Sequence, residues 1–213
     1  MSETVRYGVI GTGLMGIEHI HNLQALPGAE VVAVADPDQN SLNHAKSILN
    51  PQAGLFQNHR DLLERGECDA LVIATPNMTH TEILLEVLET ELPALVEKPL
   101  CTTVSDCEKV IEKAGNQSKI WVGLEYRYMP AIAELIRQVT EGKAGPVSMV
   151  AIREHRFPFL KKVGDWNRFN ENTGGTLVEK CCHFFDLMRL ISGSNPIRVF
   201  ASGDQDVNHL DES

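Results

Sequence analysis

Three ionisable residues in the last quarter of the chain have a spacing that suits proton transfer. Glu179, His183 and Asp186 lie at positions i, i+4 and i+7, so a continuous helix would place all three on one face. The pKa of a histidine is close to neutrality, so its ring can accept a hydroxyl proton, and a neighbouring carboxylate can orient that ring. The pattern therefore predicts an acid–base site.

Plainer interpretations of the same residues stay open. A single histidine on an apolar helix is often a hydrogen-bonded core residue, and Asp186 could form an ion pair with Arg189 or Lys180. The three site residues and Cys182 could also bind a metal, but adjacent cysteines and a histidine lack the usual spacing of zinc ligands. We therefore expect no metal site.

A glycine-rich segment near the N-terminus has the spacing of a dinucleotide-binding loop. The hexapeptide Gly11-Thr12-Gly13-Leu14-Met15-Gly16 follows an apolar segment and precedes an amphipathic one. The first glycine permits a tight turn, the second lets the backbone approach a pyrophosphate, and the third allows close packing of helix against strand. Such spacings also occur in ordinary turns, but the flanking segments favour a site where helix N–H groups meet phosphates.

Asp36 ends the next apolar segment, 20 residues after Gly16. A carboxylate at this position can accept hydrogen bonds from the hydroxyls of an adenosine ribose, and it repels a 2′-phosphate. The residues that follow, Pro37-Asp38-Gln39, supply no compensating cation. NAD is therefore favoured over NADP, although an Asp before a proline also serves as a turn initiator.

Alternating apolar and amphipathic segments predict the elements that position these residues. Strands are expected at 7–10, 31–35, 71–74, 94–96 and 120–123, with a weaker one at 54–56, and helices at 15–25, 41–48, 60–65, 79–90 and 104–114. Apolar strands joined by helical crossovers predict an α/β fold with a doubly wound parallel sheet. Residues 1–125 are thus expected to form a Rossmann domain that binds NAD(P).

The pattern changes after about residue 123. Helices are expected at 131–138 and 177–190, an extended run at 147–157, a polar loop at 158–173 and a last strand at 197–201. We expect residues 126–213 to form an incomplete α+β second domain. Because two strands have little core and an unpaired edge, the chain would be a fragment, a truncated product or a half that needs a partner.

Composition narrows the classes of partner. The net charge of −10 argues against nucleic acid and anionic membranes, which favour basic surfaces. The sequence has neither a run of about 18 apolar residues nor a signal-peptide pattern, so we expect a cytoplasmic protein. Five cysteines, with no C-x-x-C spacing, predict reduced thiols.

A cluster of bases stands out between residues 153 and 168 of this acidic chain. This segment contains five basic and two acidic residues, with three aromatic residues among them. The bases are Arg153, Arg156, Lys161, Lys162 and Arg168, the acids are Glu154 and Asp165, and the aromatic residues are Phe157, Phe159 and Trp166. The cluster could steer an anionic substrate such as a sugar acid, or it could be an ordinary solvated loop.

Several motifs taken together resemble the Gfo/Idh/MocA family of oxidoreductases, which includes inositol and glucose–fructose dehydrogenase-like enzymes. The glycine loop is followed by Ala74-Thr75-Pro76-Asn77 with His80, and then by Glu97-Lys98-Pro99. Gly174-Gly175 and the segment 179–186 match the second-domain helix of the family in register. The resemblance covers essentially the whole chain, and its most specific motif is 97–99.

The resemblance implies an NAD-dependent dehydrogenase that acts on a secondary alcohol of a sugar or cyclic polyol. His183 would be the acid–base residue, Lys98 would polarise the substrate oxygen, and Glu179 would belong to the same catalytic group. Strand ends of such a sheet face the ligand, so Lys98 would point towards the nicotinamide, and the Lys98–Pro99 bond could be cis. Cofactor contacts are implied for Gly11, Gly13, Leu14, Met15, Gly16, Asp36, Thr75, Pro76, Asn77, His80, Glu97 and Lys98.

Two departures from the family pattern qualify these expectations. Glu179 stands where the family usually has Asp, and Cys181 stands near a site that is usually Gly. The longer side chain would move the carboxylate by about 1 Å, enough to alter positioning and substrate choice. His80 could instead be an ordinary first-turn helix residue. The alternatives to a dehydrogenase are a non-catalytic dinucleotide-binding or regulatory protein, an inactive fragment, or a metal-dependent enzyme, and a homo-oligomer is compatible with each.

Overall fold

A six-stranded parallel sheet forms the centre of the N-terminal part of the chain. The computed structural model describes residues 4–117, 119–155 and 160–203. The strands are β1 (Val5–Ile10), β2 (Ala29–Ala35), β3 (Gly54–Phe56), β4 (Ala70–Ile73), β5 (Ala94–Glu97) and β6 (Ile120–Gly123). Their order in the sheet is β3-β2-β1-β4-β5-β6, and all neighbouring strands are parallel. The doubly wound sheet predicted from the sequence is confirmed, including its weakest strand.

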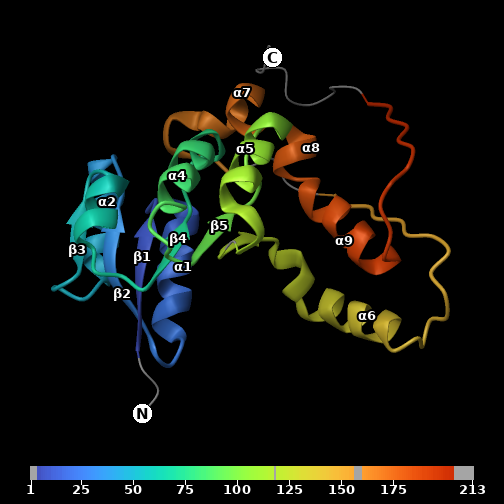
Figure 1. The fold of residues 1–213 in the computed structure, drawn as a ribbon, viewed down its shortest axis with the longest axis horizontal. Coiled ribbons are helices and arrows are strands. Elements are labelled where there is room, and N and C mark those ends of the chain that lie inside the picture. The colour runs from blue at the N-terminus through green and yellow to red at the C-terminus, as the bar shows by residue number, and fades with distance from the viewer. Residues whose placement is uncertain (1–3, 118, 156–159, 204–213) are drawn as a thin grey trace.

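Helices on both faces of the sheet complete this part of the fold (Figure 1). They are α1 (Leu14–Ala25), α2 (Gln39–Ile48), α3 (His59–Arg65), α4 (His80–Val87) and α5 (Val104–Ala114). Side chains that alternate along each strand point to opposite faces, so neighbouring residues enter different cores. Val9, for example, packs with Ile20 and Leu42, whereas Ile10 packs with Leu62 and Leu84.

The elements after β6 are η3 (Glu125–Tyr128), α6 (Pro130–Thr140), η4 (Val163–Arg168), α7 (Asn170–Thr173), α8 (Thr176–Glu179) and α9 (Cys182–Ser192). Of these, α6 and α9 lie beyond the β6 edge of the sheet, whereas α7 returns to the side of α4 and α5 (Figure 1). Two of them bring distant sequence positions together, because α9 contacts η3, and α7 contacts η1 (Asn77–Thr79) at the end of β4. Within the described ranges, no helix is long and apolar enough to cross a bilayer.

Two expected extended segments form no strand. Residues 147–155 and 197–201 run as irregular chain beyond α6 and α9 (Figure 1). The prediction of a strand at 197–201 is therefore wrong, and positions 156 and 157 of the other segment lie outside the described residues. The physical reason is that neither segment lies beside a strand with which it could share hydrogen bonds. Ile197 and Phe200 accordingly stay exposed (101% and 87%).

Candidate active site

The three glycines of the N-terminal loop have distinct steric surroundings. Gly11 has a φ of +92°, and a Cβ there would lie 2.6 Å from the carbonyl oxygen of Ala74. A Cβ on Gly16 would lie 1.9 Å from the carbonyl oxygen of Gly11, so only glycine lets α1 pack this closely. A Cβ on Gly13 would meet nothing within 4 Å. The second glycine therefore leaves open space in front of the first turn of α1.

The N-terminus of α1 keeps backbone donors for a ligand. The helix begins at Leu14, and Gly13 supplies no side-chain cap. Leu14 and Met15 are exposed beside the loop. The N–H groups of a first helical turn have no partner within their helix, and they carry the positive end of the helix dipole. This geometry suits an anionic group such as a pyrophosphate.

Asp36 lies directly beside the glycine loop, at the end of β2. One of its carboxylate oxygens accepts from the backbone N–H of Thr12 (2.7 Å), and the other accepts from that of Asp38 (2.9 Å). These bonds fix the carboxylate, which remains half-buried at the carboxyl end of the sheet. The hydroxyl of Thr12 also donates to the first oxygen (3.2 Å), so of about four acceptor positions of the carboxylate one remains for a ribose hydroxyl.

The segment after β4 supplies a buried amide. Thr75 and Pro76 are half-buried, and Asn77 is 5% exposed. The Nδ2 atom of Asn77 has no hydrogen-bond partner among the described residues. A buried donor without a partner costs about 1–3 kcal/mol, so this amide suits a polar ligand group at the strand end.

His80 is fully buried and contacts two loop segments. Its Nδ1 lies 2.8 Å from the carbonyl oxygen of Pro99, and its Nε2 lies 3.1 Å from that of Thr75. Burial lowers the pKa of this imidazole. With both ring nitrogens against backbone carbonyls, His80 links the segments that follow β4 and β5. The interpretation of His80 as the first residue of a helix fits this arrangement better than a direct cofactor contact does.

Glu97 and Lys98 stand at the end of β5, next to α1. The carboxylate of Glu97 accepts from Nε2 of His19 in α1 (2.8 Å). Burial would raise the pKa of Glu97, but its hydrogen bond to His19 and the nearby charges of His19 and Lys98 outweigh this effect and lower it. The Lys98–Pro99 peptide bond is cis, as the sequence suggested.

Lys98 joins the sheet to the second part of the chain. Its ammonium group donates to the backbone oxygen of Glu179 (3.2 Å), 81 positions further along. A glycine makes a second junction: Gly174 has a φ of +78°, and a Cβ there would lie 2.6 Å from the carbonyl oxygen of Thr102. Gly174 therefore allows the chain just before α8 to approach the segment that follows Lys98.

The helix expected over 177–190 is interrupted, so that prediction is wrong. Helix α8 ends at Glu179, and α9 begins at Cys182. The carbonyl of Glu179 accepts from the Lys98 ammonium and from the Cys182 thiol, and the N–H of Cys181 donates to Thr176. Glu179 and His183 are nevertheless close to the same lysine, although not through the shared helix face that their spacing suggested.

His183 is the most enclosed ionisable group of the second part. The residue is 1% exposed, and its ring stacks on Tyr126 with centroids 4.2 Å apart and planes inclined by 11°. Burial lowers the pKa of His183 to about 4, with further contributions from the charges of Lys98 and Lys180. The ring is therefore neutral at pH 7 and can accept a proton.

The two nitrogens of His183 have different surroundings. Nε2 lies 3.4 Å from a carboxylate oxygen of Glu125, which follows β6. The pKa of Glu125 is raised by burial and by the charge of Glu97. Nδ1 of His183 is buried and has no hydrogen-bond partner within the described part of the chain. A buried polar atom of this kind suits a group supplied by a ligand.

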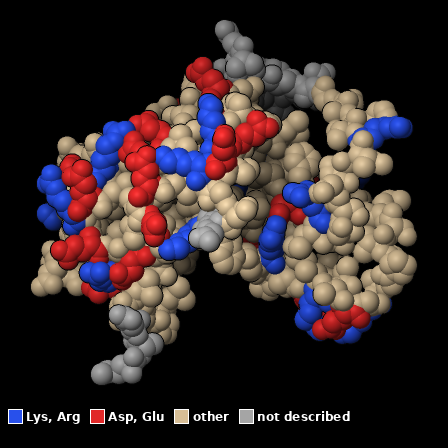
Figure 2. Space-filling view, viewed as in Figure 1, with Lys and Arg blue, Asp and Glu red and all other residues tan. Residues whose placement is uncertain are grey.

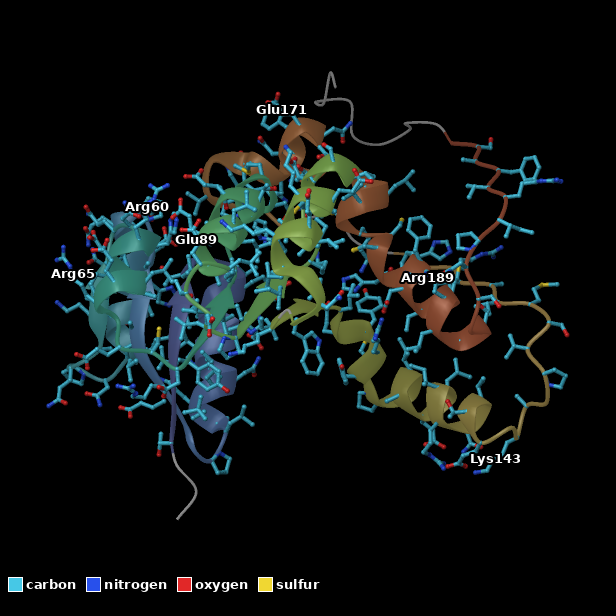
Figure 3. All side chains as sticks on the ribbon, viewed as in Figure 1. Arg60, Arg65, Glu89, Lys143, Glu171 and Arg189 are labelled. Atoms are coloured by element: carbon cyan, nitrogen blue, oxygen red, sulfur yellow. The ribbon has the colours of Figure 1, made fainter. Side chains whose placement is uncertain are left out.

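Asp186 forms its ion pair with Arg127 rather than with His183. Its carboxylate accepts from Nε of Arg127 (2.6 Å) and from Nη2 of the same guanidinium, which links α9 to η3. Arg189, labelled in Figure 3, donates instead to Asn195 (2.9 Å). The alternative pairing of Asp186 with Arg189 or Lys180 is therefore wrong, whereas its charge still raises the pKa of His183.

The basic loop contributes one cation near Lys98. The pKa of Lys162 is lowered by burial and then by the charge of Lys98, while Glu179 and Glu97 act in the opposite direction. Its ammonium group lies 5.9 Å from the ring centre of Trp166. Lys161 pairs with Asp165 (3.5 Å) at the surface. Three further residues named for this loop, Arg156, Phe157 and Phe159, lie outside the described residues.

Sequence reasoning missed several residues near His183 and its helix: Glu125 and Tyr126 beside the ring, Arg127 on Asp186 of α9, and Lys180. A signal for the first three was present, because they directly follow β6, and strand ends of a parallel sheet face the ligand. Lys180 had no such signal, since only the fold brings it to Tyr126. No group of three or more metal-ligand side chains occurs in the ranges that the structure describes.

Comparison with family models identifies both parts of the chain. Residues 5–126 match the model described as "Oxidoreductase family, NAD-binding Rossmann fold" of the Gfo/Idh/MocA set. Residues 136–212 match the corresponding model described as "Oxidoreductase family, C-terminal alpha/beta domain". The two matched ranges together cover most of the chain.

Individual relatives point to the same group of proteins. Inositol 2-dehydrogenase 1 of Paenarthrobacter aurescens is 31% identical, over 99% of this chain and 64% of that protein. Inositol 2-dehydrogenase of Pseudarthrobacter chlorophenolicus is 33% identical, over 91% of this chain and 56% of that protein. The chain thus spans somewhat more than half the length of these curated relatives.

A solved structure shares the fold over most of the described chain. The myo-inositol dehydrogenase of Lactobacillus casei, solved in complex with NAD(H) and myo-inositol, superposes with a TM-score of 0.71 at 28% sequence identity. The match covers 89% of this chain and 55% of that one.

Proposed function

This chain belongs to the Gfo/Idh/MocA oxidoreductase family, and from that premise we propose that it is an NAD-dependent dehydrogenase of a secondary alcohol in a cyclic polyol or sugar. One observation carries the proposal most directly. Lys98, at the end of the dinucleotide-binding sheet, reaches the backbone of Glu179, and its charge acts on the buried imidazole of His183. An inositol is the first substrate to test, since similar proteins are named inositol 2-dehydrogenases.

The residues of the sheet fit a nicotinamide dinucleotide. Gly13 leaves room before the free N–H groups of α1, which would hold the pyrophosphate. Asp36 would accept from the adenosine ribose and disfavour a 2′-phosphate, which supports NAD over NADP. The unpaired amide of Asn77 would donate to the nicotinamide side. The bound cofactor supplies the hydride acceptor of the reaction.

His183 of the second part and Lys98 at the end of β5 would handle the proton. His183 is neutral at pH 7, so it can take the hydroxyl proton of an alcohol as hydride leaves the carbon. Lys98 would donate to the same oxygen and stabilise the negative charge that develops there. The backbone oxygen of Glu179 holds that ammonium in place. We assign the carboxylate of Glu179 to the substrate side of the site. Its charge also acts to raise the pKa of Lys162.

Turnover on a substrate panel tests this function. The chain is mixed with NAD and with inositols, cyclic sugars and sugar acids, and NADH formation is followed by absorbance. We expect Lys98→Met and His183→Asn each to lower the rate by about 10²–10⁴-fold while NADH binding persists. Lys109→Met, a surface change on α5, serves as the matched control. Wild-type rates in both site variants would contradict the proposed roles.

A non-catalytic dinucleotide-binding protein is the second candidate. It is favoured by the small core of the second part, where Leu187 is the only buried apolar side chain after Val110 among the described residues. NADH binding by the folded chain, without turnover of any polyol or sugar in the panel, would support a non-catalytic dinucleotide-binding protein over a dehydrogenase.

A further inference from the structure

Lys180 is a buried cation in the short connection between α8 and α9. Its side chain is 8% exposed, and its ammonium group lies 3.3 Å from a carboxylate oxygen of Glu154. The same group donates to the hydroxyl of Tyr126 and lies 4.4 Å from the centre of that ring. Because burying an ammonium without partners is costly, these contacts decide where the side chain sits.

Tyr126 connects this cation to the imidazole of His183. Its hydroxyl accepts from Lys180 and donates to the carboxylate of Glu154 (3.3 Å). The ring face stacks on His183 at 4.2 Å between centroids. The phenol is therefore held at its hydroxyl by two charged groups, and it covers one face of the histidine ring.

We propose that Lys180, Tyr126 and Glu154 form a clamp that fixes the orientation of the His183 imidazole in the reaction site. The assignment deepens the proposed function, on which it rests, by naming what positions the proton acceptor. Lys180 is the charged anchor of the clamp, and Tyr126 is its contact surface. Both are positioning residues, since they act on the reaction through His183.

The positive charge of Lys180 also affects the pKa of His183, together with the other charges around the ring. The charged groups that act on or contact the ring come from the end of β5, from η3, from α9 and from the α8–α9 connection: Glu97, Lys98, Glu125, Asp186 and Lys180. Arg127 pairs with Asp186 behind them. Lys98 and Lys180 lower the pKa of His183, whereas Glu97 and Asp186 raise it. The clamp therefore keeps the imidazole neutral as well as oriented, and loss of the Lys180 charge must raise the pKa of His183.

An NMR titration of the full chain tests the clamp without any need for turnover. The protein carries isotope-labelled histidine, and the His183 signals are identified by their loss in His183→Gln. The wild-type midpoint should lie near pH 4. Lys180→Met should raise it by about 0.5 unit or more, Lys180→Arg should restore it, and Lys109→Met should leave it unchanged. A Lys180→Met midpoint equal to that of the wild type would overturn the proposal.

Tyr126 provides a second variant in case Lys180→Met does not fold. Tyr126→Leu removes the stacked ring, so water reaches the imidazole and the midpoint should move towards 6.5. Tyr126→Phe keeps the ring and should cause a smaller rise. If Tyr126→Leu titrates like the wild type in a folded sample, the clamp is wrong.

Steady-state kinetics separate the clamp from the proposed function. With an active substrate, Tyr126→Leu should lower kcat by about 10-fold or more while KM changes less than about 3-fold, because ring orientation affects chemistry more than binding. The predicted NMR shifts without turnover on any substrate would support the clamp and overturn the dehydrogenase. Turnover by the wild type, with no shift of the His183 midpoint in Lys180→Met or Tyr126→Leu, would support the dehydrogenase and overturn the clamp.

Discussion

Residues 5–123 and residues 160–203 bury different kinds of side chain. In the first region the buried residues are mostly apolar, and they pack on both faces of the sheet. In the second region one apolar residue, Leu187, is buried, whereas the buried polar residues are Asn167, Thr173, Glu179, Lys180 and His183. The cofactor side of the molecule is thus built on a hydrophobic core, and the second side is built on polar contacts.

This difference indicates that contacts with the first region, rather than an apolar core of its own, hold the second region in place. Its large apolar side chains lie mostly on the outside, and Figure 2 shows the part beyond α9 as mostly uncharged, whereas acidic and basic groups alternate over α2 to α5. Its anchors are junctions with the first region: Gly174 against Thr102, and Lys98 on Glu179. The predicted site lies at these junctions, so order in the second region and chemistry depend on the same contacts.

The largest expected effect comes from the apolar core. Ile73→Ala removes a fully buried side chain and should lower the free energy of unfolding by about 2–5 kcal/mol. The two tryptophans report on the regions separately in urea, Trp121 in β6 and Trp166 in η4, each in a variant lacking the other. Leu187→Ala should shift only the Trp166 transition. Equal shifts of both transitions by Leu187→Ala would remove the distinction between the regions.

The next largest effect is the pH dependence of the stability of the second region. The folded pKa of His183, about 4, lies below its ordinary value of 6.5, so between these values the unfolded chain binds more protons. Stability is complete above pH 6.5 and falls as the pH drops towards 4, by about 2 kcal/mol at pH 5. His80 acts in the same direction in the first region. His183→Gln should therefore flatten the pH dependence of the Trp166 transition alone, and an unchanged slope would count against a buried neutral imidazole.

The smallest expected effect concerns the ion pair between Arg127 and Asp186. Asp186→Asn weakens the link between α9 and η3. It should lower the free energy of unfolding that Trp166 reports by about 1 kcal/mol. Glu134→Gln breaks an exposed pair with Arg137 within α6 and should cost less than about 0.5 kcal/mol. Equal costs in thermal melts would show that α9 is not held by this junction.

The sequence predicted the first region well because its signals are local. Apolar runs bounded by glycine and by amphipathic segments locate the strands, and the structure confirms the tight turn expected at Gly11 and the close packing expected at Gly16. Even the three-residue strand β3 was detected. Each of these features depends on residues that are close together in the chain.

The second region was predicted less well because distant residues decide its structure. The apolar pattern through Leu177, Val178 and Cys181 continues as if one helix were present, but Lys98 binds the Glu179 carbonyl where that helix breaks. The partner of Asp186 lies 59 positions away, and Tyr126 lies 54 positions from Lys180. Periodicity carries no information on contacts of this range.

Calorimetric titration with NADH tests the central claim, that the glycine loop and Asp36 hold the dinucleotide. We expect the folded chain to bind NADH more tightly than NADPH. Gly13→Val should weaken NADH binding by at least about 10-fold with little change in melting temperature, because a Cβ at this position meets no protein atom within 4 Å and the side chain enters the space proposed for the ligand. No heat of binding in a folded wild-type sample, or equal affinity in Gly13→Val, would contradict the account.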